Sequence, residues 1–256
     1  MVSKGVPAQN PTPAPPHPAA QPPSPVYPSD VVVAPSPPAN LDYSAGLSPL
    51  QCGTPLSAAQ DADVEIAHKR NAVREAMVHT WTGYKKFSWG YDEMQPVSHR
   101  GKNWLNQGAT IVDALSTLKV MGLEDEFAEA AKWVKEHDFS KSGKVSFFET
   151  TIRDLGGLLS AYDLTADKEL LAKAQDLGNR LMAAFSPSPI GIPTPQVDLG
   201  TGETAEGWLG RSSLLAEMGT IQLEFRQLSH YTGDSRFSDA AAVSYTHLTL
   251  PTIYSV

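Results

Sequence analysis

The chain has 256 residues, a formal net charge of −8 and a single cysteine, Cys52. Mild acidity without a basic cluster argues against a nucleic acid or an anionic membrane surface as the partner. One cysteine excludes an intrachain disulfide, and no apolar run approaches the roughly 18 residues that a membrane span requires.

Residues 1–60 form a proline-rich segment that carries almost no charge. Fifteen of the 21 prolines lie within the first 55 residues, where only Lys4, Asp30 and Asp42 have charged side chains. This composition has no helical period and too few apolar residues for a core, so we expect a disordered stem or linker. A ligand for an SH3-type domain is the alternative, because such domains bind polyproline helices.

A folded domain is expected over 61–242, where apolar residues recur at helical spacing and charges of both signs return. Long strand patterns are absent from the sequence, so the fold class is predicted to be all-α. The expected helices run over 63–87, 108–121 and 124–137, then through Glu149, over 166–185 and 212–231, and onward from about residue 234.

Three segments of this domain resemble one another: Gly122 to Phe127, Thr165 to Leu170 and Thr232 to Phe237. Each follows an apolar helix, places an acidic residue in a short turn and enters a new helix. A repeat of this kind is typical of a helical solenoid or an α/α toroid, with a plain bundle as the alternative. The Pro- and Gly-rich stretch 186–203 is too long for a minimal bundle connection and favours the toroid.

The helical pattern stops after Ala242. Residues 243–256 are rich in Thr, Tyr and β-branched residues, contain no Asp, Glu, Lys or Arg, and do not continue the stripe of Phe237 and Ala241. We expect a non-native tail here. A genuine loop that leads into a strand is the alternative.

The stretch FFETTIRDLGGLLSAY, residues 147–162, places an acid and a base on one turn of an otherwise apolar helix. Leu155 and Leu159 belong to the apolar stripe, and Glu149 and Arg153 lie four residues apart on the adjacent stripe. A charged pair beside a buried face predicts a functional site. An ordinary helical ion pair, worth about 0.2–0.5 kcal/mol, is the alternative.

This stretch and four others resemble the class I α-1,2-mannosidases, glycoside hydrolase family 47. The others are KFSWGYDEMQPVS at 86–98, NQGATIVDALSTLKVMGLEDEF at 106–127, KAQDLGNRL at 173–181 with GIP at 191–193, and LAEMGTIQLEFRQLSHYTGD at 215–234. The resemblance implies an (α/α)7 barrel, of which this chain would supply about half of the helices. It also implies a calcium ion at the barrel floor and inverting hydrolysis of α-1,2-linked mannose from high-mannose N-glycans.

An inverting glycosidase needs one protonated carboxyl for the leaving group and one carboxylate that activates water across the sugar ring. By resemblance, Glu149 matches the candidate general acid, and Arg153 and Glu217 match residues that contact the sugar. Asp92 and Glu224 are also expected to bind substrate, although Asp92 could instead cap a turn and either glutamate could lie on a solvated helix face.

The chain also departs from the family pattern. Ser116 stands where the family usually has aspartate, and nothing after Ala242 matches the segments that should carry the other carboxylates and the calcium-binding threonine. We therefore expect no metal ligand in this chain, and an inactive fragment of an enzyme. Trp89 and Trp104 could stack on sugar faces, although aromatic residues in helical arrays more often belong to the core.

Two other interpretations stay open at this point. One is a non-catalytic glycan-binding or quality-control protein of the same barrel family, and the other is a helical-repeat scaffold without a sugar. The resemblance implies a place in the lumen of the endoplasmic reticulum or Golgi. Because the N-terminus lacks the apolar core of a signal peptide, membrane attachment would require an N-terminal anchor that is missing here.

Overall fold

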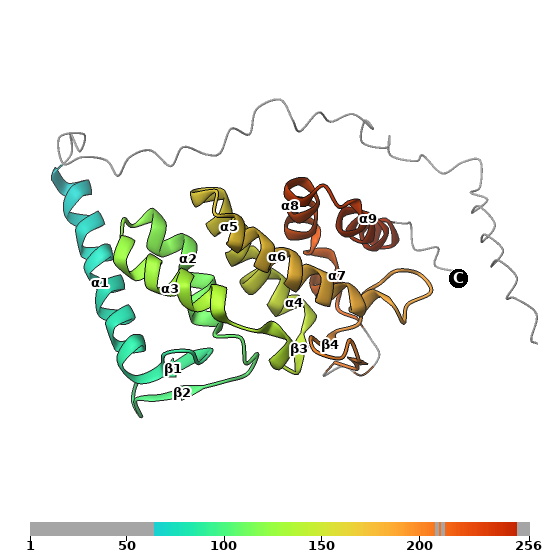
Figure 1. The fold of residues 1–256 in the computed structure, drawn as a ribbon, viewed down its shortest axis with the longest axis horizontal. Helices are drawn as coiled ribbons and strands as arrows, with labels where there is room; N and C mark the ends of the chain where they lie inside the picture. The colour runs from blue at the N-terminus through green and yellow to red at the C-terminus, as the bar shows by residue number, and fades with distance from the viewer. Residues whose placement is uncertain (1–63, 208–209, 211–212, 250–256) are drawn as a thin grey trace, which may run out of the picture. The chain divides into compact units, whose positions relative to one another are not determined.

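The computed structural model describes residues 64–207, 210 and 213–249. The expected proline-rich segment over 1–60 and the last residues of the expected tail lie outside this part of the chain. The described residues are mainly helical, as the sequence predicts, and Figure 1 shows the helices following one another from α1 to α9.

The N-terminal part consists of three helices and a hairpin. Helix α1 (Val64–Ser88) is followed by two antiparallel strands, β1 (Glu93–Gln95) and β2 (Arg100–Lys102). Helices α2 (Ala109–Val120) and α3 (Glu124–Glu136) then pack against each other. A 3-10 turn, η1 (Phe139–Lys141), leads to the next strand.

One helical stretch, from Phe147 to Thr165, carries the predicted acid and base. It consists of α4 (Phe147–Glu149), a π-helical segment η2 (Thr150–Leu155) and α5 (Gly156–Thr165). The Ser146 hydroxyl caps its start by accepting a hydrogen bond from the Glu149 backbone N–H at 3.2 Å. A π-helical segment adds one residue to the local turn, and such segments are frequent at functional sites.

The C-terminal part adds four helices and closes a small sheet. The strands β3 (Lys144–Ser146), β4 (Gln196–Asp198) and β5 (Thr204–Ala205) pair antiparallel in that order. The remaining elements are α6 (Lys168–Leu181), a 3-10 turn η3 (Met182–Phe185), α7 (Leu215–Gly219), α8 (Gln222–Thr232) and α9 (Ser235–Thr249).

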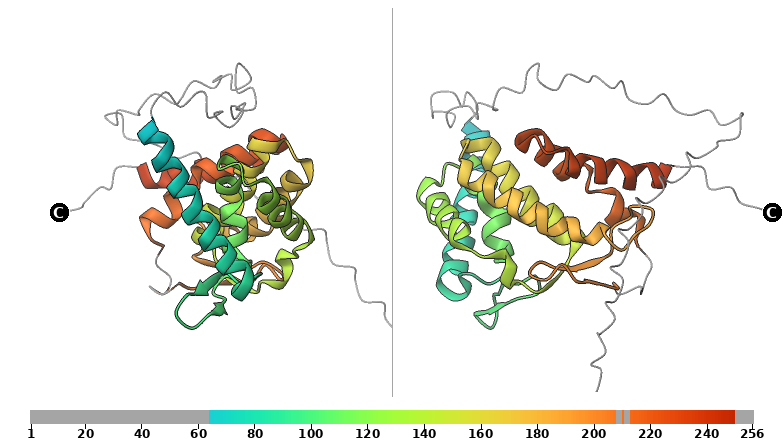
Figure 2. Two further views of the ribbon diagram at one scale, coloured as in Figure 1. Left: turned by 90° about the vertical axis from the view of Figure 1, so that its left-hand side faces the viewer. Right: turned by 45° about the vertical axis from the view of Figure 1, so that its right-hand side comes forward.

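The helices lie in two packed rows. In one row α5 packs against α2 on one side and α8 on the other, and in the second row α3 packs against α6. Paired helices such as α5 and α6 lie side by side in both views of Figure 2. Gly157 permits the close approach of α5 to α2, since a Cβ there would lie 2.5 Å from the carbonyl oxygen of Val112.

The structure corrects the sequence-based prediction at three places. Long strands are absent from the described residues, but five short strands are present, which the sequence did not reveal because segments of two or three residues are too short to show a period of two. The helix expected over 212–231 is two helices, α7 and α8, which are separated at Thr220 and Ile221. The helical pattern also does not stop at Ala242, because α9 continues to Thr249 and keeps Ser244 buried with its hydroxyl bonded to the Met218 carbonyl at 2.9 Å.

Candidate active site

Glu149 and Arg153 form an ion pair on the row of helices α2, α5 and α8. Arg153 Nε donates a hydrogen bond to Glu149 Oε2 at 2.6 Å, and Arg153 Nη1 reaches Asp113 Oδ2, on α2, at 3.5 Å. The guanidinium group therefore joins carboxylates from two neighbouring helices. The hydrogen bond to Glu149 raises the pKa of Arg153, so the guanidinium stays charged.

Trp104 completes this group of side chains, which we call the Arg153 cluster: Asp113, Glu149, Arg153 and Trp104. The guanidinium carbon of Arg153 lies 5.8 Å from the centroid of the Trp104 ring, within cation–π range. Trp104 is 43% exposed, so part of its aromatic surface remains open beside two carboxylates. An accessible aromatic face with planar charged groups beside it can hold a polar ligand that also has an apolar face.

Asp92 is buried away from solvent and organises the loop before α2. Its side chain is 2% exposed, and its two oxygens accept hydrogen bonds at 2.6 to 3.1 Å from five backbone N–H groups. Burial alone would raise the pKa of Asp92, but these N–H groups outweigh it and lower the pKa. The donors are the N–H groups of Trp104, Leu105, Asn106, Gln107 and Ala109.

This geometry separates Asp92 from the other predicted site residues. Its carboxylate lies under the loop 103–107, and the same loop carries Trp104 toward Arg153. The structure supports the capping alternative for this residue more strongly than direct contact with a sugar. Trp89 is partly buried and packs against the core, with its ring 5.8 Å from that of Trp81, and it also lines a pocket on the surface.

Glu224 lies on the same helical row as the Arg153 cluster. A Cβ on Gly156 would lie 3.7 Å from Cγ of Glu224, which places this glutamate against the start of α5. Its Oε2 atom is buried and has no hydrogen-bond partner within the described part of the chain. Burial raises the pKa of Glu224, a property that catalytic acids share.

Glu217 lies beside Phe148, next to the turn that holds Glu149. Together with Pro195 and Met218 these residues line a cavity of about 10 Å³, which is far too small for a sugar. Among the described residues, no hydrogen bond or ion pair joins Glu217 or Glu224 to Glu149 or Arg153. The structure thus brings Glu224 to the same helical row and leaves Glu217 beside a narrow cavity.

Sequence reasoning missed Asp113 and Asp154. Asp113 is the only acidic residue of α2, and an isolated acid in an apolar helix is the signal that could have identified it. Asp154 is fully buried, and within residues that the structure describes neither of its carboxylate oxygens has a hydrogen-bond partner. No sequence signal identifies this burial, because it follows from the π-helical segment that turns Asp154 into the core.

Neither a metal centre nor a membrane span is found in the described ranges. No group of three or more His, Cys, Asp or Glu side chains in these ranges could hold a metal ion. None of the helices there combines the length and the apolar character needed to cross a membrane.

The paired helices define an α-helical protein, in which the Arg153 cluster brings charged groups from neighbouring helices beside an exposed aromatic ring. The chain belongs to glycosyl hydrolase family 47, whose family profile matches residues 76–253. This match confirms the family resemblance seen in the sequence. It also includes residues 243–253, which the sequence alone had assigned to a non-native tail.

Curated relatives are mannosidases. The chain is 48% identical over 181 residues to the endoplasmic reticulum mannosyl-oligosaccharide 1,2-alpha-mannosidase of Rattus norvegicus, covering 70% of this chain and 27% of the relative. The Homo sapiens enzyme of the same name is 45% identical, with 76% and 28% covered. A mannosyl-oligosaccharide 1,2-alpha-mannosidase of Arabidopsis thaliana is 44% identical, with 76% and 36% covered.

A solved structure shares the fold. The alpha-1,2-mannosidase from Trichoderma reesei superposes with a TM-score of 0.64 at 32% sequence identity, over 72% of this chain and 41% of that chain. The chain thus spans between 27% and 36% of the length of the three curated relatives named above.

Proposed function

We propose that this chain forms one wall of the substrate pocket of an α-1,2-mannosidase, and that the Arg153 cluster is the sugar-binding part of that wall. The single observation that carries the proposal is the Arg153 guanidinium, which bridges Glu149 and Asp113 next to the exposed ring of Trp104. Relatives that are named mannosyl-oligosaccharide 1,2-alpha-mannosidases support α-1,2-linked mannose of high-mannose N-glycans as the substrate class.

In this proposal each member of the cluster has a distinct role. Arg153 donates hydrogen bonds to neighbouring hydroxyls, because its planar fork can serve two acceptors at once. Trp104 stacks on the apolar face of the sugar. Glu149 is the general acid. Sugar hydroxyls that accept the hydrogen bonds of Arg153 would release the Glu149 carboxyl from the ion pair.

The other predicted residues take supporting places. Glu224, held on the same row with a raised pKa, is a further carboxyl that could face the sugar. Asp92 positions Trp104 through the loop that it binds, rather than touching substrate itself. Glu217 is the least supported, because the cavity it lines, about 10 Å³, leaves no room for a sugar.

Inversion also requires a carboxylate across the sugar ring, roughly 6.5–9.5 Å from the acid. The cluster supplies Asp113, but Arg153 binds that carboxylate on the same wall as Glu149. We therefore expect the 256-residue chain by itself to release no mannose. Ca²⁺ prefers six to eight oxygen ligands, and the described residues offer no matching cluster, so no step of this proposal involves the ion.

We further propose that the two rows of helices belong to an α/α barrel and that the protein acts in the lumen of the endoplasmic reticulum or Golgi. The names of two relatives, which print the endoplasmic reticulum, support the first of these compartments. Glycan binding without hydrolysis, by a quality-control protein of the same family, is the alternative. The ion pair that holds Glu149 favours it, since a carboxylate bonded to a guanidinium is not ready to donate a proton.

Calorimetric titration with α-1,2-mannobiose tests the sugar-binding role of Arg153. Arg153→Ala should weaken binding by at least about tenfold, since a hydrogen bond from a charged group is worth about 1.5–3 kcal/mol. Arg153→Lys should restore part of the loss by keeping the charge without the fork. Arg180→Ala is the matched control, because Arg180 pairs with Asp176 in the same i, i+4 geometry on α6.

The proposal fails if Arg153→Ala binds mannobiose as the unmodified chain does, or if Arg180→Ala loses as much affinity. Mannose released from the disaccharide by the 256-residue chain would contradict the expected inactivity while supporting the site. Binding without release agrees with both expectations.

A further inference from the structure

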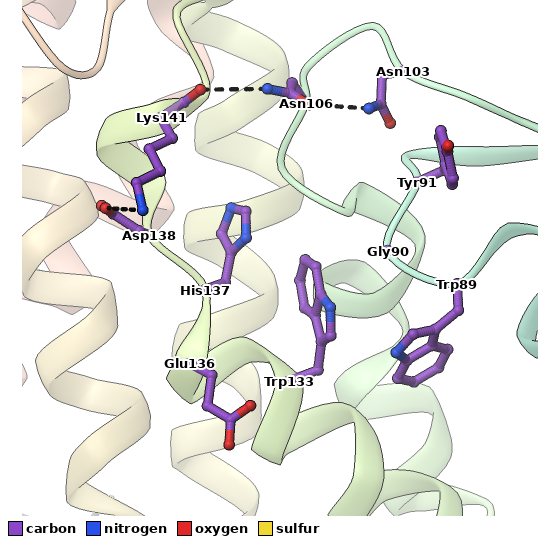
Figure 3. A pocket seen from close by; sticks show the side chains of 10 residues that line it. All are labelled: Trp89, Gly90, Tyr91, Asn103, Asn106, Trp133, Glu136, His137, Asp138 and Lys141. Carbon is purple, nitrogen blue, oxygen red and sulfur yellow. Dashed lines mark hydrogen bonds and ion pairs between the residues drawn. The ribbon is translucent and has the colours of Figure 1, made fainter.

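A pocket that contains no member of the Arg153 cluster is lined in part by Asn103 and Asn106 of the loop 103–107 (Figure 3). Its volume is about 570 Å³, within the range of small-ligand sites. It lies between the loop after α1, the loop 103–107 and the end of α3 with the turn that follows. The residues that matter here are Tyr91, Asn103, Asn106, Trp133, Glu136 and Lys141.

Tyr91 provides a flat aromatic surface in this pocket. Its ring lies directly on Gly101, where a Cβ would come within 2.3 Å of Cγ of the tyrosine. The ring is nevertheless 45% exposed and lines the pocket, so the face away from Gly101 is open to a ligand. A tyrosine supported from below by glycine and exposed above is suited to stacking on another flat, partly apolar group.

Trp133 forms the opposite side and is held firmly. Its ring stacks on His137 with centroids 4.7 Å apart and an interplanar angle of 18°. Gly108, which has a positive φ, leaves room for the indole, because a Cβ there would lie 2.3 Å from its ring. Figure 3 shows the Trp133 and Tyr91 rings on facing sides of the same space.

Two amides of the loop 103–107 line the pocket and are held by hydrogen bonds. Asn103 Nδ2 donates to Asn106 Oδ1 at 2.9 Å, and Asn106 Nδ2 donates to the Lys141 carbonyl oxygen at 3.3 Å. Asn103 Oδ1 accepts from the backbone N–H of Asp92 at 3.0 Å. Each amide nitrogen carries a second N–H, and each amide oxygen a second lone pair, for a ligand.

The charges of the pocket favour a neutral ligand. Lys141 Nζ lies 3.4 Å from Asp138 Oδ2, and Glu136 adds a negative charge at the rim. Among the lining residues there is thus no surplus of positive charge for an anion. Aromatic surface, fixed amides and carboxylates together match a polyhydroxylated ring, which offers both an apolar face and many hydroxyl groups.

We propose that this pocket is a second carbohydrate subsite, which binds another residue of the same branched mannose oligosaccharide whose α-1,2-linked end meets the Arg153 cluster. The inference rests on the proposed function for the identity of the sugar. The loop 103–107 connects the two sites, since Trp104 faces Arg153 while Asn103 and Asn106 line the pocket. Asp92 fixes this shared wall from below.

Two ligands separate this subsite from the Arg153 cluster: a branched high-mannose oligosaccharide and α-1,2-mannobiose, each titrated into the full chain. Tyr91→Ala should weaken binding of the branched ligand roughly fivefold, the effect of losing one aromatic stacking partner, and leave mannobiose unchanged. Tyr91→Phe, which keeps the ring, should bind both ligands as the unmodified chain does. Arg153→Ala should weaken both.

The indole N–H resonance of Trp133 in the unmodified chain gives a second measurement that does not depend on a variant. It should shift with the branched ligand and stay in place with maltose. Unchanged affinity of Tyr91→Ala for the branched ligand overturns the subsite, as does equal weakening of both ligands or a silent Trp133 resonance. If mannobiose does not bind but the branched ligand still requires Tyr91, the subsite stands and the proposed function fails.

Discussion

The Asp92→Ala variant is expected to lose about 4 kcal/mol of unfolding free energy, because removing one side of a buried charge network costs about 3–5 kcal/mol. Five backbone N–H groups in the loop 103–109 would lose their acceptor at once. Several of these donors belong to buried residues, where water cannot readily replace the carboxylate. Urea unfolding monitored by circular dichroism measures the loss.

The contribution of Asp92 should also depend on pH in a defined direction. Burial opposes ionisation, but the backbone N–H groups prevail and the pKa of Asp92 lies below its ordinary value. Its stabilisation is therefore complete above the ordinary pKa, about 3.9, and disappears as the pH falls through the lowered pKa of the folded state. Asp138→Ala is the control, because that exposed carboxylate caps a 3-10 turn and pairs with Lys141 at the surface, without the burial of Asp92. If Asp92→Ala and Asp138→Ala unfolded at similar urea concentrations, the stabilising role of Asp92 would be contradicted.

Asp154→Asn is expected to stabilise the protein at neutral pH. Asp154 is fully buried, and neither oxygen has a partner among the residues that the structure describes. Burial raises its pKa well above the ordinary value, and the negative charges of Asp92 and Asp113 act in the same direction. At neutral pH the folded protein therefore holds a proton on Asp154 that the unfolded chain releases. This difference lowers the free energy of unfolding by about 1.4 kcal/mol for each unit by which the folded pKa exceeds the unfolded one, up to the pH of the measurement.

The sign of this effect is opposite to that of Asp92. Stability due to the protonated Asp154 is complete below the ordinary pKa of aspartate and declines as the pH rises toward the raised pKa of the folded state. Arg153 and Glu149, the other charged groups near it, modify the shift but do not reverse it. Urea midpoints measured from pH 4 to pH 8 should fall less steeply for Asp154→Asn than for the unmodified chain. Parallel curves would refute the assignment, and Asp125→Asn on the exposed start of α3 serves as control.

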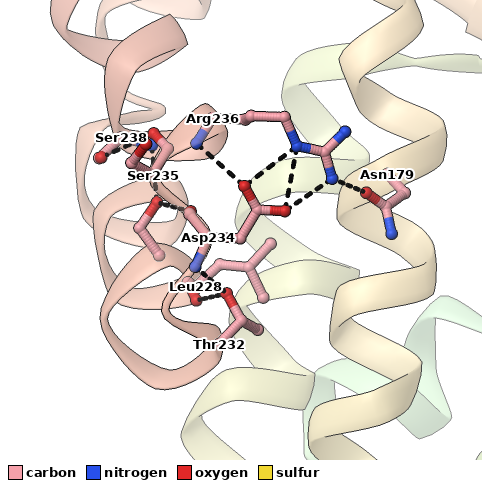
Figure 4. A network of polar contacts seen from close by, with 8 residues as sticks. Asn179, Leu228, Thr232, Asp234, Ser235, Arg236 and Ser238 are labelled. Carbon is pink, nitrogen blue, oxygen red and sulfur yellow. Dashed lines mark hydrogen bonds and ion pairs between the residues drawn. The ribbon is translucent and has the colours of Figure 1, made fainter.

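The helices could be predicted from the sequence because amphipathic spacing and helix caps are local signals. The repeated turns show this most clearly. Asp167 accepts a hydrogen bond from the Glu169 N–H at 3.0 Å, and Asp234 accepts one from the Arg236 N–H at 3.1 Å, as the aligned segments predict. Figure 4 shows the turn at Asp234, where Arg236 also donates a hydrogen bond to Asn179 at 3.0 Å and so connects α9 to α6.

What the sequence missed depends on non-local geometry. The π-helical segment Thr150–Leu155 interrupts the period of 3.6 residues that the stripe assumed, so Asp154 is buried while Ile152 is only partly buried. Where α9 continues past Ala242, the buried Ser244 hydroxyl bonds the Met218 carbonyl, which lies 26 residues earlier in the chain. A single-sequence pattern contains neither piece of information.

The candidate site was predictable to a similar extent. The i, i+4 spacing of Glu149 and Arg153 allows an ion pair, which the sequence offered as the alternative to a functional site, and the structure shows that pair at 2.6 Å. Asp113 joins them only through the packing of α2 on α5, which no local pattern reveals. An aspartate at position 92 could either cap the loop or bind a sugar. Only its five hydrogen bonds to backbone N–H groups of the loop favour the capping role, and these are not visible in the sequence.

The central claim is that Glu149, Arg153, Asp113 and Trp104 together form a wall that binds mannose. A crystal structure of the chain with α-1,2-mannobiose tests it most directly. We predict one sugar ring against Trp104, with hydroxyl groups within hydrogen-bond distance of Arg153 and Glu149. A disaccharide that binds elsewhere and leaves these four side chains without a sugar contact would contradict the claim.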